Sequence, residues 1–233
     1  LITSPGILLS HPVLVIARQN NVPIIGDIEL GIRYIPVKRP KLVGVTGTNG
    51  KTTVTLLIEH MLRKAGKAVY AVGNVGNAFL DEFDKRLNAD VLVVELSSQQ
   101  LENIQTPCFD IGCIVNITPN HLDWHGSMEA YVKAKLRLRE LVKTDTMIIK
   151  DDLSHYFSHA VQLVGSQVDL SIINGNIMRF GLSEGVCSQL LLNSFPHDQE
   201  NFLFAYGVCR MLDVPPEVAI AAFETFVKPP HRI

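Results

Sequence analysis

The clearest chemical feature of this 233-residue chain is a glycine-rich stretch, GVTGTNGKTT, at residues 44–53. An apolar run precedes it and a helical pattern follows it, which is the strand–loop–helix setting of a phosphate site. Backbone N–H groups of such a loop bind oxyanions, Lys51 would neutralise the β and γ phosphates, and the Thr52 hydroxyl would bind Mg2+. Val45 stands where the G-x-x-x-x-G-K-[ST] pattern has its first glycine. A glycine-rich turn without a ligand fits the flanking elements poorly, so the stretch predicts binding of ATP or GTP.

A carboxylate follows a second apolar run. Residues 91–94 read VLVV, and Glu95 comes directly after them. An acidic residue at the carboxyl end of a buried strand, beside a phosphate loop, is where an Mg2+ ligand is expected. The alternative is a strand-end carboxylate that only caps the following turn.

Two histidines lie in a third stretch, NITPNHLDWHG, at residues 116–126. His121 and His125 have the i, i+4 spacing of a zinc-binding helix, but Leu122 occupies the position where the H-E-x-x-H motif has its glutamate. A proline and a glycine in the stretch predict a loop, and a zinc protease is therefore disfavoured. A loop that follows a strand beside a nucleotide site suits metal or substrate binding. A structural role for His121 remains the alternative.

A lysine on a predicted helix could also carry chemistry. Lys135 shares one helical stripe with Tyr131, Leu138 and Val142, which predicts partial burial. Desolvation lowers the pKa of a lysine and leaves a nucleophilic neutral amine. The alternative is a lysine that covers apolar surface with its stem and keeps its charge in water.

The elements that must position these residues alternate between strand and helix. We expect helices at 13–19 and after Asp27, and then strands at 42–46, 68–72, 91–96, 111–117 and 146–149, with helices at 52–65, 127–142, 200–212 and 216–226. The strands are apolar nearly throughout, which is typical of parallel strands covered on both faces. Asn174-Gly175 between apolar runs predicts a hairpin at 169–182. The expected fold is α/β, with a phosphate loop, a mainly parallel sheet flanked by helices and a hairpin appendage.

Composition limits the classes of protein. Lys+Arg 21 against Asp+Glu 23 gives a formal net charge of -2, which does not suit a nucleic-acid binder. Hydrophobic residues make up 47% and charged residues 19%, so disorder is not expected. The apolar runs are shorter than the ~18 residues that span a bilayer, and the first residues do not have the pattern of a signal peptide. The four cysteines show no zinc spacing. We expect a cytoplasmic protein.

The two ends suggest a segment of a longer protein. The chain begins with Leu1 instead of Met, and it stops just after Pro229-Pro230. Residues 1–34 are expected to form a small unit, and Pro36 and Pro40 mark a linker to the following domain.

Four motifs together resemble the Mur ligases. They occur in the family's order: TGTNGKTT (46–53), GNVG (73–76), ELSS (95–98) and NITPNHLD (116–123). Three further stretches are most similar to the branch that adds D-glutamate to UDP-N-acetylmuramoyl-L-alanine: SPGI (4–7), PIIGDIEL (23–30) and ELSSQQLE (95–102). The resemblance extends over essentially the whole chain.

This resemblance implies an ATP-dependent amide-bond ligase of peptidoglycan precursor synthesis. The L-alanyl carboxylate would attack the γ-phosphate to give an acyl phosphate, which the amine of D-glutamate would then attack. Residues 1–34 would be the tail of a UDP-binding domain, 35–228 the central ATP-binding domain, and 229–233 a hinge to a third domain. The chain alone is expected to be inactive, and the whole enzyme to be a monomer without nucleic-acid partners or membrane insertion.

The resemblance also assigns roles to individual residues. The phosphate loop comprises Gly47, Thr48, Asn49, Gly50, Lys51, Thr52 and Thr53, and the nucleotide would also contact His197, Asn201 and Arg232. The resemblance assigns metal binding to Thr52, Glu95 and His121, together with Lys135 once it is carbamylated. The expected catalytic groups are Lys51, Glu95, His121 and Lys135. The substrate would contact Ser4, Gly6, Asn74 and His121.

Three residues depart from the family pattern. Asn120 replaces an acidic residue, Gln99 an aromatic one, and Asp198 an asparagine in the adenine-binding stretch.

Three alternative functions also stay open. The first is a sister Mur ligase or a ligase of the folylpolyglutamate synthase type with another acceptor. The second is a phosphate-loop switch or motor, although no guanine-selective Asn-Lys-x-Asp motif is present. The third is a fragment that only binds nucleotide.

Overall fold

A computed structural model describes most of the chain. The described residues are 1–8, 10–35, 40–76, 78–81, 83–144, 146–150, 153, 161–163, 172–173, 177–178 and 195–228. Three features considered from the sequence lie outside these residues: Arg232, Cys187, which is one of the four cysteines, and the Asn174-Gly175 turn. No helix in the described ranges is long and apolar enough to cross a membrane.

The core is a six-stranded parallel sheet with strand order β4-β5-β3-β6-β7-β8. Its strands are β3 (Lys41–Thr46), β4 (Val69–Gly73), β5 (Val91–Glu95), β6 (Ile111–Ile114), β7 (Met147–Lys150) and β8 (Val161–Leu163). In the register, Val45 of β3 is paired with Glu95 of β5 and with Cys113 of β6. The carboxyl ends of three neighbouring strands therefore lie side by side, where ligands bind in sheets of this type.

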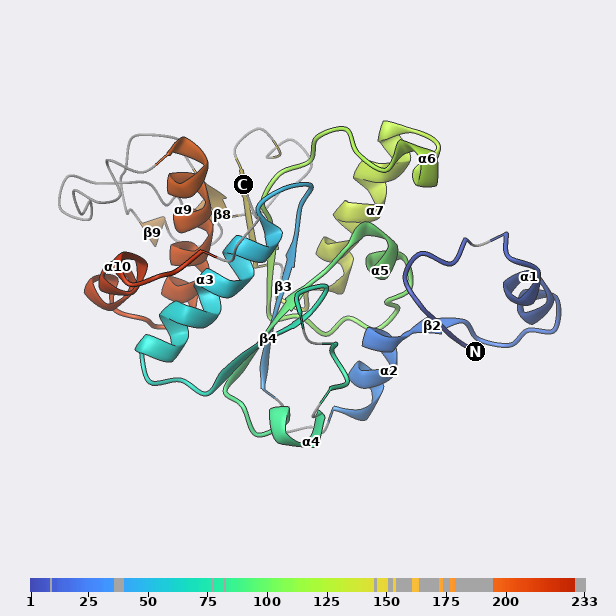
Figure 1. Cartoon of the computed structure of the whole chain (residues 1–233), viewed down its shortest axis with the longest axis horizontal. Helices are drawn as coiled ribbons and strands as arrows, with labels where there is room; N and C mark the ends of the chain where they lie inside the picture. Colours follow the sequence, from blue (N-terminus) through green and yellow to red (C-terminus); the bar gives the residue numbers. More distant parts are fainter. Residues whose placement is uncertain are drawn as a thin grey trace.

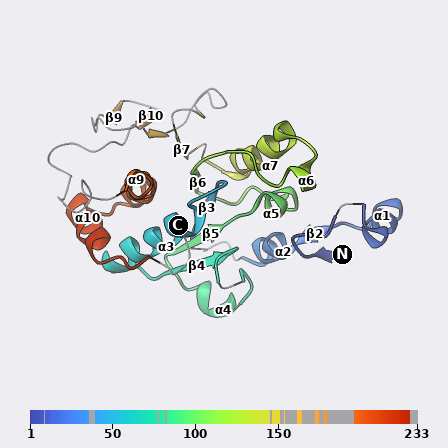
Figure 2. The same cartoon turned by 45° about the horizontal axis from the view of Figure 1, so that its top comes forward.

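Helices cover both faces of the sheet (Figures 1 and 2). On one face α3 (Lys51–Lys64), α9 (Pro196–Met211) and α10 (Pro216–Glu224) enclose an apolar cluster with alternate strand residues such as Val43 and Val93. The other face carries α2 (Asp27–Tyr34), α5 (Ser98–Glu102) and α7 (Met128–Leu141), which pack on the opposite set, such as Leu42 and Val94. Because both faces are buried, the strands are apolar without alternation.

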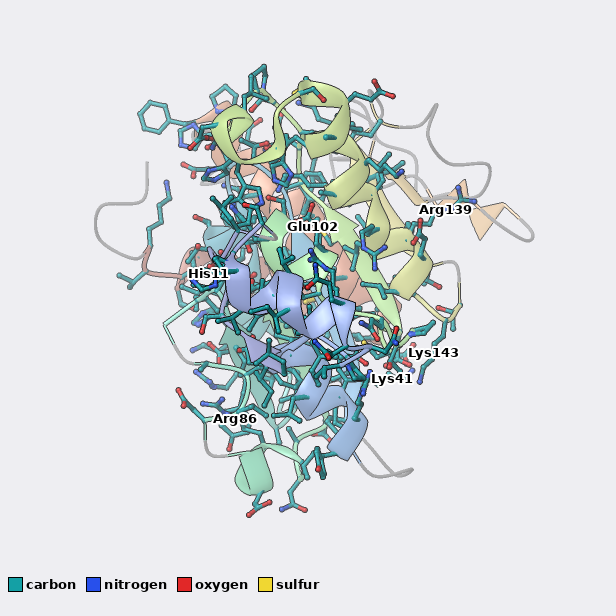
Figure 3. All side chains as sticks on the ribbon, turned by 90° about the vertical axis from the view of Figure 1, so that its right-hand side faces the viewer. His11, Lys41, Arg86, Glu102, Arg139 and Lys143 are labelled. Carbon is teal, nitrogen blue, oxygen red and sulfur yellow. The ribbon has the colours of Figure 1, made fainter. Side chains whose placement is uncertain are left out.

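The N-terminal residues form a small unit beside the main sheet. β1 (Ile2–Thr3) and β2 (Ile25–Gly26) form a separate two-stranded parallel sheet, and α1 (Pro12–Gln19) lies between them in sequence. Figure 3 looks onto this unit, with His11 at the start of α1 and Glu102 just above that helix. The unit is joined to the main domain through Glu29, a fully buried residue of α2. Its carboxylate accepts hydrogen bonds from Arg33 Nε at 2.7 Å, from Thr106 Oγ1 at 2.7 Å and from the backbone N–H of Gln105 at 2.8 Å.

Most of the predicted elements are confirmed, including the doubly covered parallel sheet. β9 (Ile172–Ile173) and β10 (Ile177–Met178) pair antiparallel, as the predicted hairpin requires. The prediction of a plain loop over 116–126 is wrong in part, because Leu122–His125 form a single helical turn, α6. Sequence patterns missed the short elements: β1, β8, α5 and α4 (Phe83–Arg86). Elements of two to five residues are too short to show a hydrophobic period.

Candidate active site

The glycine-rich stretch forms a loop between the end of β3 and the start of α3. Gly50 is the N-cap of α3 and has a left-handed backbone with φ 78°. This backbone conformation favours glycine, and a Cβ at this position would lie 2.6 Å from Asn201 Oδ1, so the Asn201 amide would have to move. No side chain caps the helix, and its first N–H groups therefore point into the loop as donors for an oxyanion.

Asn116, two residues after the end of β6, holds the loop in shape. Its side-chain Oδ1 accepts hydrogen bonds from the backbone N–H groups of Thr48 at 3.2 Å and Asn49 at 2.9 Å, and its Nδ2 donates to Asn49 O at 3.2 Å. The Thr48 hydroxyl in turn lies 3.0 Å from the hydroxyl of Tyr131 on α7. In the sequence, Asn116 belongs to a motif but has no predicted role. The feature that could have indicated one is an amide side chain just after the end of a strand that pairs with β3.

Glu95 lies beneath the loop as a fully buried carboxylate. Thr52 Oγ1 donates to its Oε2 at 2.8 Å, and Asn74 Nδ2 donates to its Oε1 at 2.9 Å. A carboxylate and a hydroxyl at this distance are hard oxygen donors of the kind that Mg2+ prefers, so these residues fit the ion. Within the described ranges no group of three or more His, Cys, Asp and Glu side chains is placed to hold a metal. This donor set suits Mg2+, which usually keeps water and phosphate oxygens as its other ligands.

Lys135 approaches the loop from the other side and is only 2% exposed, which confirms the predicted burial. Its Nζ donates to Gly47 O at 2.8 Å and lies 4.8 Å from the centroid of the Tyr131 ring. Burial, with a smaller contribution from the charge of Lys51, lowers the pKa of Lys135 to about 7. Near neutral pH a substantial fraction of this amine is therefore uncharged and nucleophilic.

The two histidines of the third motif have different surroundings. His121 has a left-handed backbone, φ 50°, at the start of α6, and it is exposed at the wall of a pocket. His125 is turned into the protein, where its Nε2 lies 2.9 Å from Ser98 Oγ. Burial lowers the pKa of His125, although the carboxylate of Glu102 acts in the opposite direction. The sequence assigned no role to Ser98. For His125 it offered only the zinc-binding spacing with His121, which was disfavoured.

Two cavities meet at the phosphate loop. The first, of about 270 Å³, is lined by Thr48, Asn49, Gly50, Lys51, Thr52, Thr53, Asn116, His197, Asp198, Glu200, Asn201 and Lys228. The second, of about 300 Å³, is lined by Pro5, Gly6, Gly47, Thr48, Lys51, Asn74, Ser97, Ser98, Gln99, His121, Tyr131 and Lys135. Thr48 and Lys51 belong to both walls, so a group bound at the loop can be reached from either cavity.

Most of the predicted site residues are brought together in this way. His197 and Asn201, at the start of α9, line the first cavity together with residues 48–53 of the loop, and Gly47 lines the second. Gly6, Asn74, His121 and Lys135 line the second cavity. Ser4 is exposed and precedes Pro5 of that wall but is not part of it. Glu95 lines neither cavity and is connected to their walls by its hydrogen bonds from Thr52 and Asn74.

Asp198, which departs from the family pattern, forms an ion pair in the structure. Asp198 is buried in the wall of the first cavity, and its carboxylate accepts a hydrogen bond from Lys228 Nζ in an ion pair. The neighbouring His197 imidazole stacks on the ring of Phe195, with centroids 5.6 Å apart. His197 and Asp198 thus bring an aromatic ring and a paired charge to the wall of the first cavity.

The parallel sheet and the glycine-rich loop between β3 and α3 define an α/β domain with the architecture of a phosphate loop. Residues 45–179 match the Mur ligase middle domain. The chain belongs to the Mur ligase family.

Individual relatives agree with this assignment. The chain is 34% identical to the UDP-N-acetylmuramoylalanine–D-glutamate ligase of Protochlamydia amoebophila (strain UWE25), with 100% of this chain and 53% of that protein covered. It is also 34% identical to the enzyme of the same name from Nitrosococcus oceani, with 100% and 52% covered. The chain thus spans about half the length of these curated relatives.

Solved structures show the same fold. A pseudomurein peptide ligase type C from Methanothermus fervidus superposes with a TM-score of 0.63 at 20% identity, covering 99% of this chain and 58% of that one. A UDP-N-acetylmuramoyl-L-alanyl-D-glutamate–2,6-diaminopimelate ligase gives a TM-score of 0.64 at 20% identity, with 99% and 61% covered.

Proposed function

We propose that the full-length gene product containing this chain joins D-glutamate to UDP-N-acetylmuramoyl-L-alanine and converts ATP to ADP and phosphate. The observation that carries the proposal is the shared wall: Lys51 and Thr48 border both cavities, so a nucleotide in one and an acceptor in the other would meet at the phosphate loop. The names of the relatives at 34% identity support the choice of substrates.

The proposed reaction has two steps. An oxygen of the L-alanyl carboxylate attacks the γ-phosphorus of ATP, the bond from that phosphorus to the β-phosphate oxygen breaks, and an acyl phosphate and ADP result. The amine of D-glutamate then attacks the acyl carbon; phosphate leaves, and the attacking nitrogen loses a proton as the amide forms. The first step needs in-line placement and neutralisation of negative charge, which Lys51 and the N–H groups of the loop and of α3 supply.

Thr52 and Glu95 are the residues that would hold Mg2+ at the phosphates, with His121 and a carbamylated Lys135 at a second ion on the acceptor side. Bound Mg2+ neutralises phosphate charge during the transfer. Carbamylation of Lys135 fits its setting: the uncharged amine attacks the carbon of CO2, a proton is released, and an anionic carbamate replaces a buried cation. A pKa of about 7 makes the amine available for this step.

The other contacts follow the two cavities. His197 and Asn201 would contact the nucleoside in the first cavity, and Asn74 and Gly6, with Ser4 beside them, the muramoyl acceptor in the second. Arg232, which lies outside the described residues, is proposed as a further nucleotide contact. We further propose that residues 35–228 act as the ATP-binding domain of a monomeric cytoplasmic enzyme.

The test measures ADP release by the full-length gene product with UDP-N-acetylmuramoyl-L-alanine, with and without D-glutamate, and identifies the amide by mass spectrometry. We expect the amide only with D-glutamate, and its loss in Lys51→Ala. Lys64→Ala is the matched control, because Lys64 is an exposed lysine of the same helix. An amide with another amino acid would indicate a sister ligase, and nucleotide binding without any turnover would contradict the ligase proposal.

A further inference from the structure

His125 is a buried histidine that lines neither cavity, yet it contacts the wall of the second one. Its side chain is 2% exposed, and its Nε2 lies 2.9 Å from the hydroxyl oxygen of Ser98. On its other side, Nδ1 lies 3.7 Å from a carboxylate oxygen of Glu102. Its ring packs against Tyr131, with centroids 5.3 Å apart. Ser98 and Tyr131 both belong to the wall of the second cavity.

These contacts fix the direction of a hydroxyl in that wall. Glu102 faces Nδ1 and favours the tautomer that carries its proton there, which leaves Nε2 as an acceptor. The Ser98 hydroxyl, whose other acceptor is Gln99 Oε1 at 3.3 Å, then donates to Nε2 over the shorter distance, and its lone pairs can accept a hydrogen bond from a molecule in the cavity. His125 thus selects which hydrogen-bonding role Ser98 offers to a molecule in the cavity.

The same side chain anchors the helical turn that carries His121. α6 has only four residues, none of them buried as a whole, and its two flanking residues, His121 and Gly126, both have left-handed backbones. A turn of this length is not stable by itself. In the described structure the His125–Ser98 hydrogen bond joins α6 to α5, so the place of His121 in the cavity wall depends on it.

We propose that His125 is a positioning residue for the acceptor substrate: through Ser98, Tyr131 and α6 it fixes the wall of the second cavity. This inference rests on the proposed function, because the ligand of that cavity is taken to be UDP-N-acetylmuramoyl-L-alanine. In the described part of the chain, His125 is linked to the wall of the nucleotide cavity through Tyr131, whose hydroxyl lies 3.0 Å from that of Thr48, so KM for the acceptor and KM for ATP should respond differently.

The experiment compares KM values of the full-length gene product for the two substrates. His125→Ala should raise KM for UDP-N-acetylmuramoyl-L-alanine about tenfold, the effect of losing one buried hydrogen bond and a packed ring, and leave KM for ATP unchanged. His125→Gln, which keeps an acceptor and a donor, should restore part of the loss. Ser98→Ala should raise the same KM, and the double variant should raise it by less than the product of the two single effects, because the two residues share one hydrogen bond.

His60→Ala is the matched control. His60 Nε2 also hydrogen-bonds a hydroxyl, Thr225 Oγ1 at 3.0 Å, and its ring also packs on an aromatic one, Phe226, but neither cavity contains it. Both histidine variants should therefore lose stability. Only His125→Ala should also raise KM for UDP-N-acetylmuramoyl-L-alanine. If His125→Ala does not fold, His125→Gln and Ser98→Ala carry the same comparison.

The outcomes separate the two proposals. A folded wild-type protein that neither binds nor turns over UDP-N-acetylmuramoyl-L-alanine would overturn the proposed function and this inference with it. A wild-type protein that turns the substrate over, with variants that shift both KM values equally or shift neither, would overturn only the positioning role of His125.

Discussion

Lys51 and Lys135 donate hydrogen bonds to consecutive carbonyl groups of the phosphate loop, and both line the second cavity. Lys51 Nζ donates to Thr48 O at 2.9 Å, and Lys135 Nζ donates to Gly47 O at 2.8 Å. Burial is the main cause of the lowered pKa of Lys135, and the charge of the nearby Lys51 lowers it further. The loop is thus bordered by a cation suited to phosphate and by an amine suited to modification.

Lys135 should therefore take up CO2 while other lysines do not. With 13C-labelled bicarbonate at neutral pH, we expect one carbamate carbon resonance in the NMR spectrum of the protein. The resonance should vanish in Lys135→Met and persist in Lys133→Met, because Lys133 is an exposed lysine on the same helix. A resonance that survives in Lys135→Met would assign the modification to another amine.

Glu95 should make nucleotide binding depend on Mg2+. Glu95→Gln keeps the shape of the side chain but removes the charge, and it replaces one of the two oxygens that accept from Thr52 and Asn74 by a donating NH2 group. We expect the tightening of ATP binding by Mg2+, measured by calorimetry, to fall by about tenfold, in line with ~1.4 kcal/mol for one lost charged contact.

The control is Glu140→Gln, which removes a carboxylate whose side chain is 70% exposed on α7. It should leave the Mg2+ effect unchanged. If Glu95→Gln binds ATP with the same Mg2+ dependence as the wild type, Glu95 has no part in holding the ion.

The sequence predicted those parts of the site that follow from one local pattern. The glycine-rich loop, the strand that ends in Glu95 and the helical stripe that buries Lys135 are each visible within about 10 to 15 neighbouring positions. The strands were readable because each is apolar throughout, a direct consequence of helices on both faces.

The contacts between motifs could not be predicted in this way. Asn116 meets Asn49 across 67 positions of sequence, and His125 meets Ser98 across 27. Both contacts depend on the strand order, which places β5 and β6 on either side of β3. Glu29 gave no signal either, since a single acidic residue in an amphipathic helix is normally at the surface.

Gly50 should be sensitive to both backbone and side-chain space. Gly50→Ala places a side chain in the left-handed region and 2.6 Å from Asn201 Oδ1. We expect it to lower the free energy of unfolding by more than the ~1 kcal/mol of the backbone term and to abolish ATP binding in calorimetry.

Gly66→Ala isolates the backbone term. Gly66 has nearly the same φ, +80°, but a Cβ there has no heavy atom within 4 Å. This variant should lose about 1 kcal/mol of stability and bind ATP as the wild type does. Equal losses of binding in the two variants would mean that the contact with Asn201 does not shape the loop.

The buried carboxylate of Glu29 should make the attachment of the N-terminal unit depend on pH. Burial alone would raise the pKa of Glu29, but the hydrogen bonds from Gln105 and Thr106 and the charge of Arg33 outweigh it and lower the pKa. A carboxylate with a lowered pKa stabilises the folded state above its unfolded pKa of about 4.3, and the stabilisation is lost as pH falls through the folded value.

Glu29→Gln should accordingly lose about 2 kcal/mol of unfolding free energy in urea at pH 7, where a buried charged acceptor is replaced by a neutral amide. The difference from the wild type should stay constant down to about pH 5 and shrink below about pH 4, because protonation then removes the charge from the wild type as well. Glu140→Gln, at an exposed ion pair with 3.6 Å between Arg137 Nη1 and Glu140 Oε2, should change stability little at any pH. A difference that grows as the pH falls would have the wrong sign for a carboxylate held ionised by Gln105, Thr106 and Arg33.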